Sequence, residues 1–386
     1  MSSHYNVLPI YHDHFRPGQN IFFVRKGNNL PSFNNLFFSP IFKKCALVVA
    51  IFFLVGYFIY QDIETQNIIP AAVESASASL SYRTASSSEE SANTNAPSSQ
   101  KIAIVTYFTK DNNAQNLKKR SFPNFKQYAE KFGYDVVDVL DDPVILSFYE
   151  KEFKPKYKSL HYLKFFAMSY MLPKYDWVMW ADGDSLFLNQ SIPLTTFTEN
   201  TPFDAIFTVN PLIESPWARI INAGHYFLRN SPWTVTNFLP LAQKMALSCT
   251  DFFKETGLKI PAPLNEVFEI CNQDTGEWWS EDQGVLQYLL DEAPTSFQCH
   301  VQRRGFRDFN SEYPWYGDGD LVLHFPGTTP NERLELMDLV LRNANFTTGV
   351  VDRAGPGLDE LAPVFNERNV AGMYDEFYSF LNSPCK

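Results

Sequence analysis

The short run Trp177–Ala181 (WVMWA) constrains the fold of this chain more than any other feature of its sequence. Every side chain in the run is apolar, so a strand formed there must be covered on both faces. Such strands are typical of parallel sheets that have helices on either side. The run leads directly into Asp182-Gly183-Asp184, which places two carboxylates at the carboxyl end of a central strand. The sequence therefore predicts an α/β fold with an acidic turn at the edge of its sheet.

Strand-like and helix-like patterns alternate on both sides of that run. Before it, an apolar run rich in β-branched residues, a helical pattern and a second apolar run follow in order, which predicts parallel pairing. The expected strands are 102–108, 134–139, 205–209, 224–228 and 321–325, and the expected helices are 116–132, 157–172, 234–247 and 281–290.

The N-terminal part has a different character. Residues 45–60 contain no charged side chain, and with Ile41 and Phe42 they would form a helix about 30 Å long, enough to cross a bilayer. A buried core helix and a cleaved signal peptide are the alternatives, but the run has no polar stripe and its leader is too long. Basic residues precede the run, and Asp62 and Glu64 follow it, which predicts a cytosolic N-terminus.

The expected organisation has four parts. Residues 1–44 form a cytosolic tail, 45–60 a transmembrane signal anchor, 61–100 a disordered stem rich in serine, and 101–386 a lumenal domain. The chain is 45% hydrophobic, so it can bury a large core, and its 43 acidic against 32 basic residues give no overall basic surface. Nucleic acid is therefore not expected as a partner.

Cysteines and glycosylation triplets fit a lumenal location. Four cysteines follow the anchor and allow three pairings, among which the sequence does not choose: Cys249, Cys271, Cys299 and Cys385. Free buried thiols are the alternative. Asn189 and Asn345 begin Asn-x-Ser/Thr triplets, and Asn189 lies next to the proposed site, where packing can block a glycan.

The acidic turn is the strongest candidate for chemistry. Asp182 and Asp184 are separated by Gly183, which makes the turn flexible, so both carboxylates can approach one hard cation. That cation would bridge to a diphosphate, which an acidic domain otherwise repels. The alternative is a solvated turn, and the same triplet recurs at residues 318–320. His324, at the end of a strand-like run, would be a third ligand; a histidine hydrogen-bonded in the core is the alternative.

Two further segments carry candidate residues. Ser280 and Gln283 have the spacing of a capping box at a helix start, and spacing alone favours this interpretation. The functional alternative, which is compatible with the cap, has Asp282 and Gln283 turned toward a sugar, with Trp278 and Trp279 forming a wall of the pocket.

Asn222 and Gly224 belong to the second of these segments. They would form a close-approach turn that leads into a strand, and an ordinary strand entrance is the alternative.

Four motifs in order resemble the galactosyltransferase family of fungi and plants, glycosyltransferase family 34, over about residues 101–327: WADGD, NAG…FLRN, EDQG…YLL and HFPG. That family includes α-1,2-galactosyltransferases, subunits of mannosyltransferase complexes and xyloglucan xylosyltransferases. The resemblance implies a GT-A fold with a mostly parallel sheet, type II anchoring in the Golgi membrane, manganese, and sugar transfer from a nucleotide donor with retention of configuration.

The resemblance also implies roles for individual residues. Asp182, Asp184 and His324 would hold the metal, Asp282 and Gln283 would be the catalytic pair near the donor sugar, and the donor-binding set would be Asp182, Asp184, Asp282, Asn222, Gly224 and Lys164. The sequence departs from the family at Gly183, where Ala or Ser is frequent, and at Thr328-Thr329, where some members carry Cys-Lys.

These observations lead to one expected function and two rivals. The expected function is a metal-dependent retaining glycosyltransferase that moves a hexose, with galactose favoured, from a UDP-sugar or related donor to a glycan or glycoprotein in the Golgi lumen, alone or in a glycosyltransferase complex. The rivals are a catalytically silent glycan-binding or complex-forming subunit and a sugar-nucleotide hydrolase with the same metal site. The sequence does not identify the donor sugar, the acceptor or the linkage.

Overall fold

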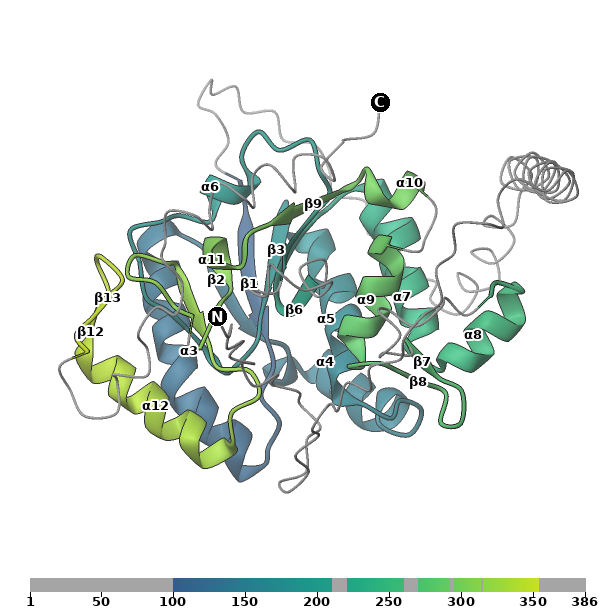
Figure 1. The fold of residues 1–386 in the computed structure, drawn as a ribbon, viewed down its shortest axis with the longest axis horizontal. Helices are drawn as coiled ribbons and strands as arrows, with labels where there is room; N and C mark the ends of the chain where they lie inside the picture. The colour runs from purple at the N-terminus through teal and green to yellow at the C-terminus, as the bar shows by residue number, and fades with distance from the viewer. Residues whose placement is uncertain (1–99, 210–220, 260–269, 292–294, 314, 354–386) are drawn as a thin grey trace, which may run out of the picture. The chain divides into compact units, whose positions relative to one another are not determined.

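A six-stranded sheet organises the computed structural model, which describes residues 100–209, 221–259, 270–291, 295–313 and 315–353 (Figure 1). These residues belong to the compact unit Ser88–Lys386. The predicted tail and anchor, all but the last residue of the predicted stem, and Cys385 lie outside the described residues. Within the described part of the chain, no helix combines the length and the apolar character needed to cross a membrane.

The strand order of the sheet is β2-β1-β3-β6-β5-β9. The pairs β2/β1, β1/β3 and β5/β9 are parallel, and β6 runs antiparallel to both of its neighbours. The fold is therefore α/β with a mostly parallel sheet, as predicted. The strands are β1 (Ile102–Thr106), β2 (Asp135–Asp138), β3 (Trp177–Ala181), β5 (Ala205–Val209), β6 (Ile221–Arg229) and β9 (Val301–Arg304).

Strand β3 is central and buried along its whole length, as its sequence requires. Val178 and Trp180 point into the core that also contains helices α5, α7 and α9, whereas Trp177 and Met179 point into the core formed with α3 and β4 (Ser185–Phe187). Covering both faces removes all five side chains of this strand from water, which stabilises the sheet by the hydrophobic effect. The covering helices are α3 (Asn112–Phe132), α5 (Leu163–Met171), α7 (Leu239–Met245) and α9 (Asp282–Asp291).

Local signals explain where the helices start and stop. The Asp111 carboxylate accepts a hydrogen bond from the Ala114 amide at the start of α3, and Gly133 ends that helix with a φ of 72°. The helix expected at 157–172 begins later than predicted. The Ser159 hydroxyl accepts from the His161 amide and starts a 3-10 turn, Leu160–Tyr162, which precedes α5.

A second, three-stranded sheet has the order β10-β11-β4, with β10 (Ser311–Glu312), β11 (Val322–His324) and β4 (Ser185–Phe187). The strand expected at 321–325 is thus present, but it belongs to this small sheet and pairs antiparallel with β4. Helix α12 (Pro330–Asn343) follows β11 and packs against α3.

The remaining elements are short or peripheral. The α-helices are α4 (Pro143–Phe148), α6 (Thr195–Thr198), α8 (Cys249–Thr256), α10 (Thr295–Gln298) and α11 (Phe306–Phe309), and the strands are β7 (Cys271–Asn272), β8 (Glu277–Trp278), β12 (Ala344–Asn345) and β13 (Val350–Val351). The 3-10 turns are η2 (Val139–Asp141), η4 (Leu160–Tyr162) and η5 (Leu172–Lys174), and the π-helical turns are η3 (Tyr149–Phe153) and η7 (Thr234–Phe238).

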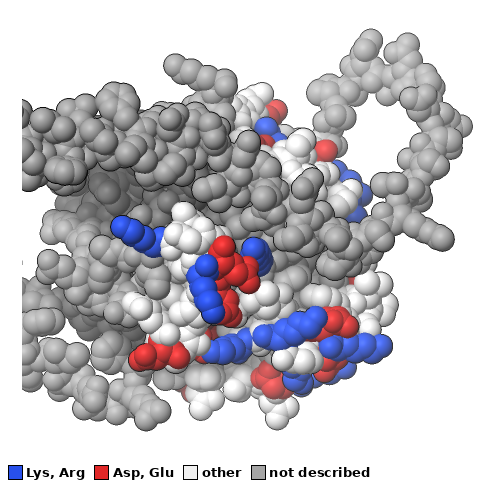
Figure 2. Space-filling view, turned by 90° about the vertical axis from the view of Figure 1, so that its right-hand side faces the viewer, with Lys and Arg blue, Asp and Glu red and all other residues white. Residues whose placement is uncertain are grey.

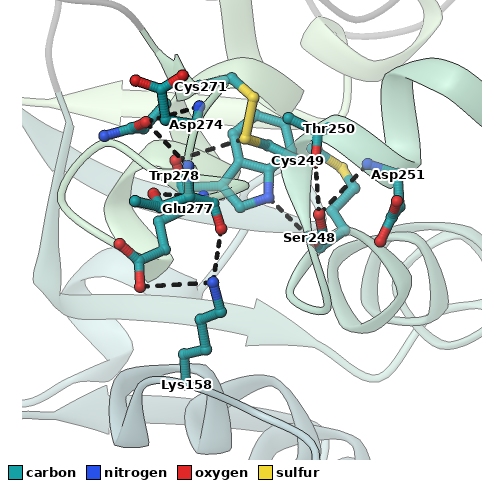
Figure 3. Close-up of a disulfide and its surroundings, with 12 residues drawn as sticks. Lys158, Ser248, Cys249, Thr250, Asp251, Cys271, Asp274, Glu277 and Trp278 are labelled. Carbon is teal, nitrogen blue, oxygen red and sulfur yellow. Dashed lines mark hydrogen bonds and ion pairs between the residues drawn. A yellow bond between two sulfur atoms is a disulfide. The ribbon is translucent and has the colours of Figure 1, made fainter.

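A disulfide joins Cys249, the first residue of α8, to Cys271 on β7 (Figure 3). Of the three predicted pairings, only the one that joins these two cysteines is compatible with this bond. Trp278 lies beside the disulfide, and its indole N–H donates to the Met245 carbonyl at 2.7 Å. Trp278 is buried in this core, and the alternative in which it forms part of a pocket wall stays a prediction.

Figure 2 shows one face of the molecule, on which the described lysines and arginines are interspersed with aspartates and glutamates. On that face the described residues form a mixed charged surface, which agrees with the charge balance of the sequence.

Candidate active site

Backbone hydrogen bonds fix the turn Asp182-Gly183-Asp184 after β3. The Asp182 amide donates to the Gly224 carbonyl on β6 at 2.9 Å, and the Ser185 hydroxyl donates to the Asp182 carbonyl at 2.7 Å. On the other side, the Phe325 amide donates to the Asp184 carbonyl at 3.0 Å. The turn is therefore held between the main sheet and the small sheet.

The same pairing brings His324 to this turn. Ser185 on β4 lies opposite His324 on β11 in the antiparallel register. His324 Nε2 consequently lies 3.3 Å from Asp184 Oδ1, and ligand atoms of Asp182, Asp184 and His324 all lie within 4.8 Å of one another. The predicted trio is thus assembled by the fold.

The donor set fits a divalent cation. Two carboxylates and one imidazole are ligands that Mn²⁺ accepts. His324 is 3% exposed, and its Nδ1 atom has no hydrogen-bond partner among the described residues, so this buried group is not satisfied by protein contacts alone. The metal-binding role of the three residues remains a prediction.

Charge neighbours set the protonation of this cluster. Burial opposes ionisation of Asp184, but Arg333 and then His324 outweigh it and lower the pKa of that carboxyl. Burial would lower the pKa of His324, but the Asp184 carboxylate raises it above its ordinary value. A metal bound to His324 would need the neutral imidazole and would therefore displace a proton.

Gly224 leaves the space that the His324 ring fills. A Cβ atom on Gly224 would lie 2.4 Å from His324 Cε1. Asn222 holds this part of β6, because its Oδ1 accepts from the Gly224 amide at 2.7 Å and its Nδ2 donates to Glu312 Oε1 at 2.5 Å. The turn expected at Asn222 and Gly224 is wrong, because both residues lie within β6, and the close approach at Gly224 is made to the His324 ring. Donor contacts of Asn222 and Gly224 remain predictions.

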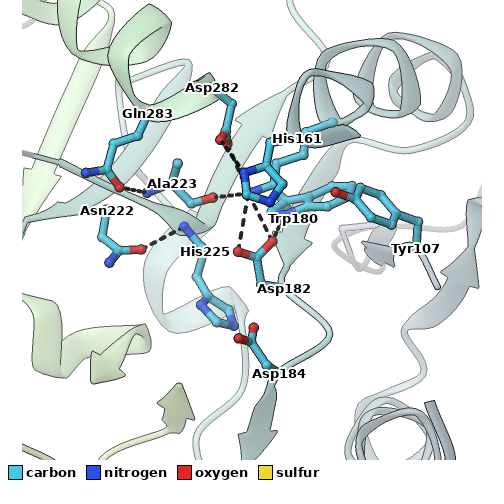
Figure 4. A network of polar contacts seen from close by, with 12 residues as sticks. Tyr107, His161, Trp180, Asp182, Asp184, Asn222, Ala223, His225, Asp282 and Gln283 are labelled. Carbon is cyan, nitrogen blue, oxygen red and sulfur yellow. Dashed lines mark hydrogen bonds and ion pairs between the residues drawn. The ribbon is translucent and has the colours of Figure 1, made fainter. Parts of the chain in front are cut away.

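Lys164 links the acidic turn to the start of α9. This buried ammonium lies 3.0 Å from Asp182 Oδ1, 3.0 Å from Asp282 Oδ2 and 3.2 Å from the Ala223 carbonyl, to which it donates. Burial opposes its charge, but the two carboxylates outweigh burial and raise the pKa of Lys164, so it stays protonated. The Trp180 indole donates to Asp182 Oδ1 at 2.7 Å and completes the support of that carboxylate. Figure 4 shows Trp180, Asp182 and Asp282 gathered around this point, beside Ala223 of β6.

The capping box predicted at Ser280 and Gln283 is wrong. Helix α9 begins at Asp282, and Ser280 and Glu281 have φ angles of 48° and 57°, outside the extended region of an N-cap residue. The Gln283 side chain instead turns to β6, where its Oε1 accepts from the Ala223 amide at 3.4 Å. Asp282 pairs with Lys164 and Gln283 contacts β6, and the role of these two side chains toward a donor sugar remains a prediction.

His161 joins the site although sequence reasoning missed it. Its Nδ1 lies 2.5 Å from Glu281 Oε2 and 3.6 Å from Asp282 Oδ1. Burial would lower the pKa of His161, but these two carboxylates raise it to about 9. Its only sequence signal was its position three residues before Lys164, in the helix expected before β3.

His225 packs against His324 and was also missed. Its ring bonds to Asn310 Oδ1 at 2.7 Å and Ser185 Oγ at 3.0 Å, and it packs edge-on against His324 with 5.1 Å between ring centroids. Burial, followed by the charge of His324, lowers its pKa to about 3, so it stays neutral. The adjacent Gly224 was a local signal, but His225 itself was given no role.

The second Asp-Gly-Asp triplet, residues 318–320, serves structure. Asp320 is buried and accepts from Arg307 Nη2 at 2.9 Å and from the Ser311 hydroxyl at 2.6 Å, and Asp318 pairs with Arg353 at 3.1 Å. The side chain of Asn189 is also engaged nearby, because its Nδ2 donates to the Gly319 carbonyl at 2.7 Å.

Comparison with known proteins gave structural neighbours only. No protein-family model and no curated protein matches the sequence, so membership of glycosyltransferase family 34 remains a prediction. Solved structures similar to this chain include a glycosyltransferase involved in glycosylation of the major capsid of PBCV-1 (15% identity, TM-score 0.39, 62% of this chain and 100% of that chain).

Two further neighbours are glycosyltransferases as well. They are the galactosyltransferase LgtC in complex with donor and acceptor sugar analogs (10% identity, TM-score 0.35, 61% of this chain and 95% of that one) and mouse xyloside xylosyltransferase 1 (10% identity, TM-score 0.34, 60% and 98%). Likenesses with TM-scores this low do not establish fold or function, so the proposal below rests on the residues of the site.

Proposed function

We propose that this protein is a metal-dependent retaining glycosyltransferase that moves a hexose, with galactose favoured, from a nucleotide-sugar donor such as a UDP-sugar to a glycan or glycoprotein. The observation that carries the proposal is the convergence of Asp182, Asp184 and His324 at the carboxyl end of β3. In open α/β sheets, ligands bind at this end of the strands. A Mn²⁺ ion held there would supply positive charge that stabilises the departing diphosphate.

The chain's own residues take the remaining roles in this proposal. Gln283 steadies the anomeric centre, and Asp282 holds hydroxyl groups of the donor sugar. The Asp282 carboxylate is 4% exposed and pairs with Lys164 at 3.0 Å, an arrangement that suits positioning better than covalent attack. The acceptor hydroxyl therefore attacks the anomeric carbon from the same face of the sugar from which the nucleotide departs. This same-face attack retains configuration without a glycosyl-enzyme intermediate.

The proposed location is the Golgi membrane, with a single span and a lumenal catalytic domain. Two features support it: the uncharged run at residues 45–60, and the disulfide Cys249–Cys271, which is typical of oxidising compartments. An epitope tag at each end, tested for antibody access after selective permeabilisation of the plasma membrane, examines the orientation.

The decisive experiment measures sugar transfer by the purified full chain. With Mn²⁺ present, we expect the chain to release nucleotide from one member of a panel of nucleotide sugars. This release should depend on a glycan acceptor, and it should be lost in Asp184→Asn. Asp318→Asn is the matched control, because Asp318 occupies the same triplet sequence away from the site. Glycan binding without turnover would instead favour the silent subunit, and free sugar as the product would favour the hydrolase.

A further inference from the structure

Arg333 forms an ion pair with Asp184, the second carboxylate of the acidic turn. It lies in the first turns of α12, and its Nη1 is 3.0 Å from Asp184 Oδ2. Its Nε donates to Thr328 Oγ1 at 3.1 Å, and its Nη2 donates to the Thr328 carbonyl at 2.9 Å. Three contacts from three nitrogens fix the plane of this guanidinium, whose side chain is 21% exposed.

This arrangement makes Arg333 a competitor of any metal at the site. Asp184 uses Oδ1 toward His324 and Oδ2 toward Arg333, so both oxygens already face a cationic or protonatable group. A divalent ion that binds Asp184 must share or displace the guanidinium, and the two positive charges then repel each other. The repulsion is relieved when a dianionic or trianionic group arrives beside them.

Once a metal is bound to Asp184, the geometry of the guanidinium suits a phosphate group as its new partner. Its parallel N–H groups match two oxygens of a carboxylate or a phosphate, whereas an ammonium offers a point charge. Because the guanidinium is rigid and planar, Nη1 leaves Asp184 only when the whole group moves. That movement also breaks the contacts of Nε and Nη2 with Thr328 and frees this pair of N–H groups for two oxygens of a phosphate.

We infer that Arg333 exchanges partners during the binding cycle: it pairs with Asp184 before the metal binds and with the diphosphate of the donor afterwards. Metal and nucleotide then bind cooperatively, because each favours the state in which Arg333 has left Asp184. This inference rests on the proposed function, and it adds a coupling between the two ligands that the metal trio alone does not supply.

The test measures Mn²⁺ binding to the full chain by the EPR signal of the free ion, first without nucleotide and then with UDP or GDP. We expect Arg333→Gln to bind Mn²⁺ alone about tenfold more tightly, since one charge-assisted hydrogen bond to Asp184 no longer competes. We also expect the gain in Mn²⁺ affinity that the nucleotide confers to shrink by about tenfold.

Two further variants serve as controls for Arg333→Gln. Arg342→Gln removes an exposed arginine from the last turn of the same helix and should behave as the unmodified chain. Arg333→Lys keeps the positive charge but loses the fork, so Mn²⁺ alone should bind about as in the unmodified chain while the nucleotide gain falls. Equal melting temperatures establish that the variants are folded.

The outcomes separate this inference from the proposed function. If Mn²⁺ binds, Asp184→Asn abolishes binding, and Arg333→Gln leaves the affinity for Mn²⁺ alone unchanged or weaker, the partner exchange is refuted and the metal site stands. If Mn²⁺ bound to the unmodified chain is insensitive to Asp184→Asn, the metal site itself is wrong and the exchange falls with it.

Discussion

Replacing Gly224 with alanine tests whether the close approach of β6 to His324 sets the geometry of the site. The added Cβ would lie 2.4 Å from His324 Cε1 and 2.9 Å from Nδ1, whereas ordinary van der Waals contact begins at 3.4 Å. The imidazole must therefore move by about 1 Å, because its neighbour across the gap is the backbone of a buried strand. Overpacking of this kind costs about 1–3 kcal/mol of folding stability.

The effect on function should be larger than the effect on stability. A displaced ligand typically weakens metal binding by about 10–100-fold, and a misplacement of about 1 Å can reduce a rate by about 100-fold, equal to about 2.7 kcal/mol. We expect losses of this size in Mn²⁺ affinity, measured by isothermal titration calorimetry, and in kcat/KM for the sugar transfer. Urea denaturation of the same sample measures the stability cost separately.

A double-mutant cycle identifies the cause. If Gly224→Ala acts by pushing His324 away, the substitution should have little further effect on Mn²⁺ affinity in a His324→Ala background. The reasoning is refuted if the two substitutions are additive, or if Gly224→Ala alone leaves Mn²⁺ affinity unchanged.

Two further predictions concern stability. Lys164→Met should lower the free energy of unfolding by about 3–5 kcal/mol in urea denaturation without metal, because it leaves two carboxylates without their buried partner. Lys119→Met, at an exposed lysine, is the control. An equal loss of stability in both variants would contradict the role of the buried Lys164 ion pairs. His161 has a folded pKa of about 9 against 6.5 in its unfolded state, so its ion pairs stabilise fully below about pH 6.5, and this contribution is lost as pH rises toward 9. Since its side chain is half exposed, the loss should stay below about 1 kcal/mol; it is measured by urea denaturation at about pH 6 and about pH 9 and should be absent in His161→Gln. Equal pH dependence of stability in the unmodified chain and in His161→Gln would contradict a stabilising role of the His161 ion pairs.

Local patterns were sufficient for most of the architecture. The strands β1, β2, β3, β5 and β6 and the helices α3 and α9 lie where the apolar periodicity placed them, because alternation and helical spacing are properties of neighbouring residues. The capping box at Ser280 failed because the backbone there takes left-handed φ angles, which the side-chain spacing does not encode.

The sequence by itself determined that an apolar strand ends in two carboxylates, since both features are contiguous in the chain. Only the tertiary structure decided which of two identical Asp-Gly-Asp triplets could bind a metal. Strand β11 brings His324 to residues 182–184, whereas within residues 318–320 Asp320 pairs with Arg307 and accepts a hydrogen bond from Ser311. Arg333 likewise reaches Asp184 through the pairing of β4 with β11 and the helix that follows. These partners are distant in sequence, and their contacts depend on strand register and packing, which no local pattern of residues specifies.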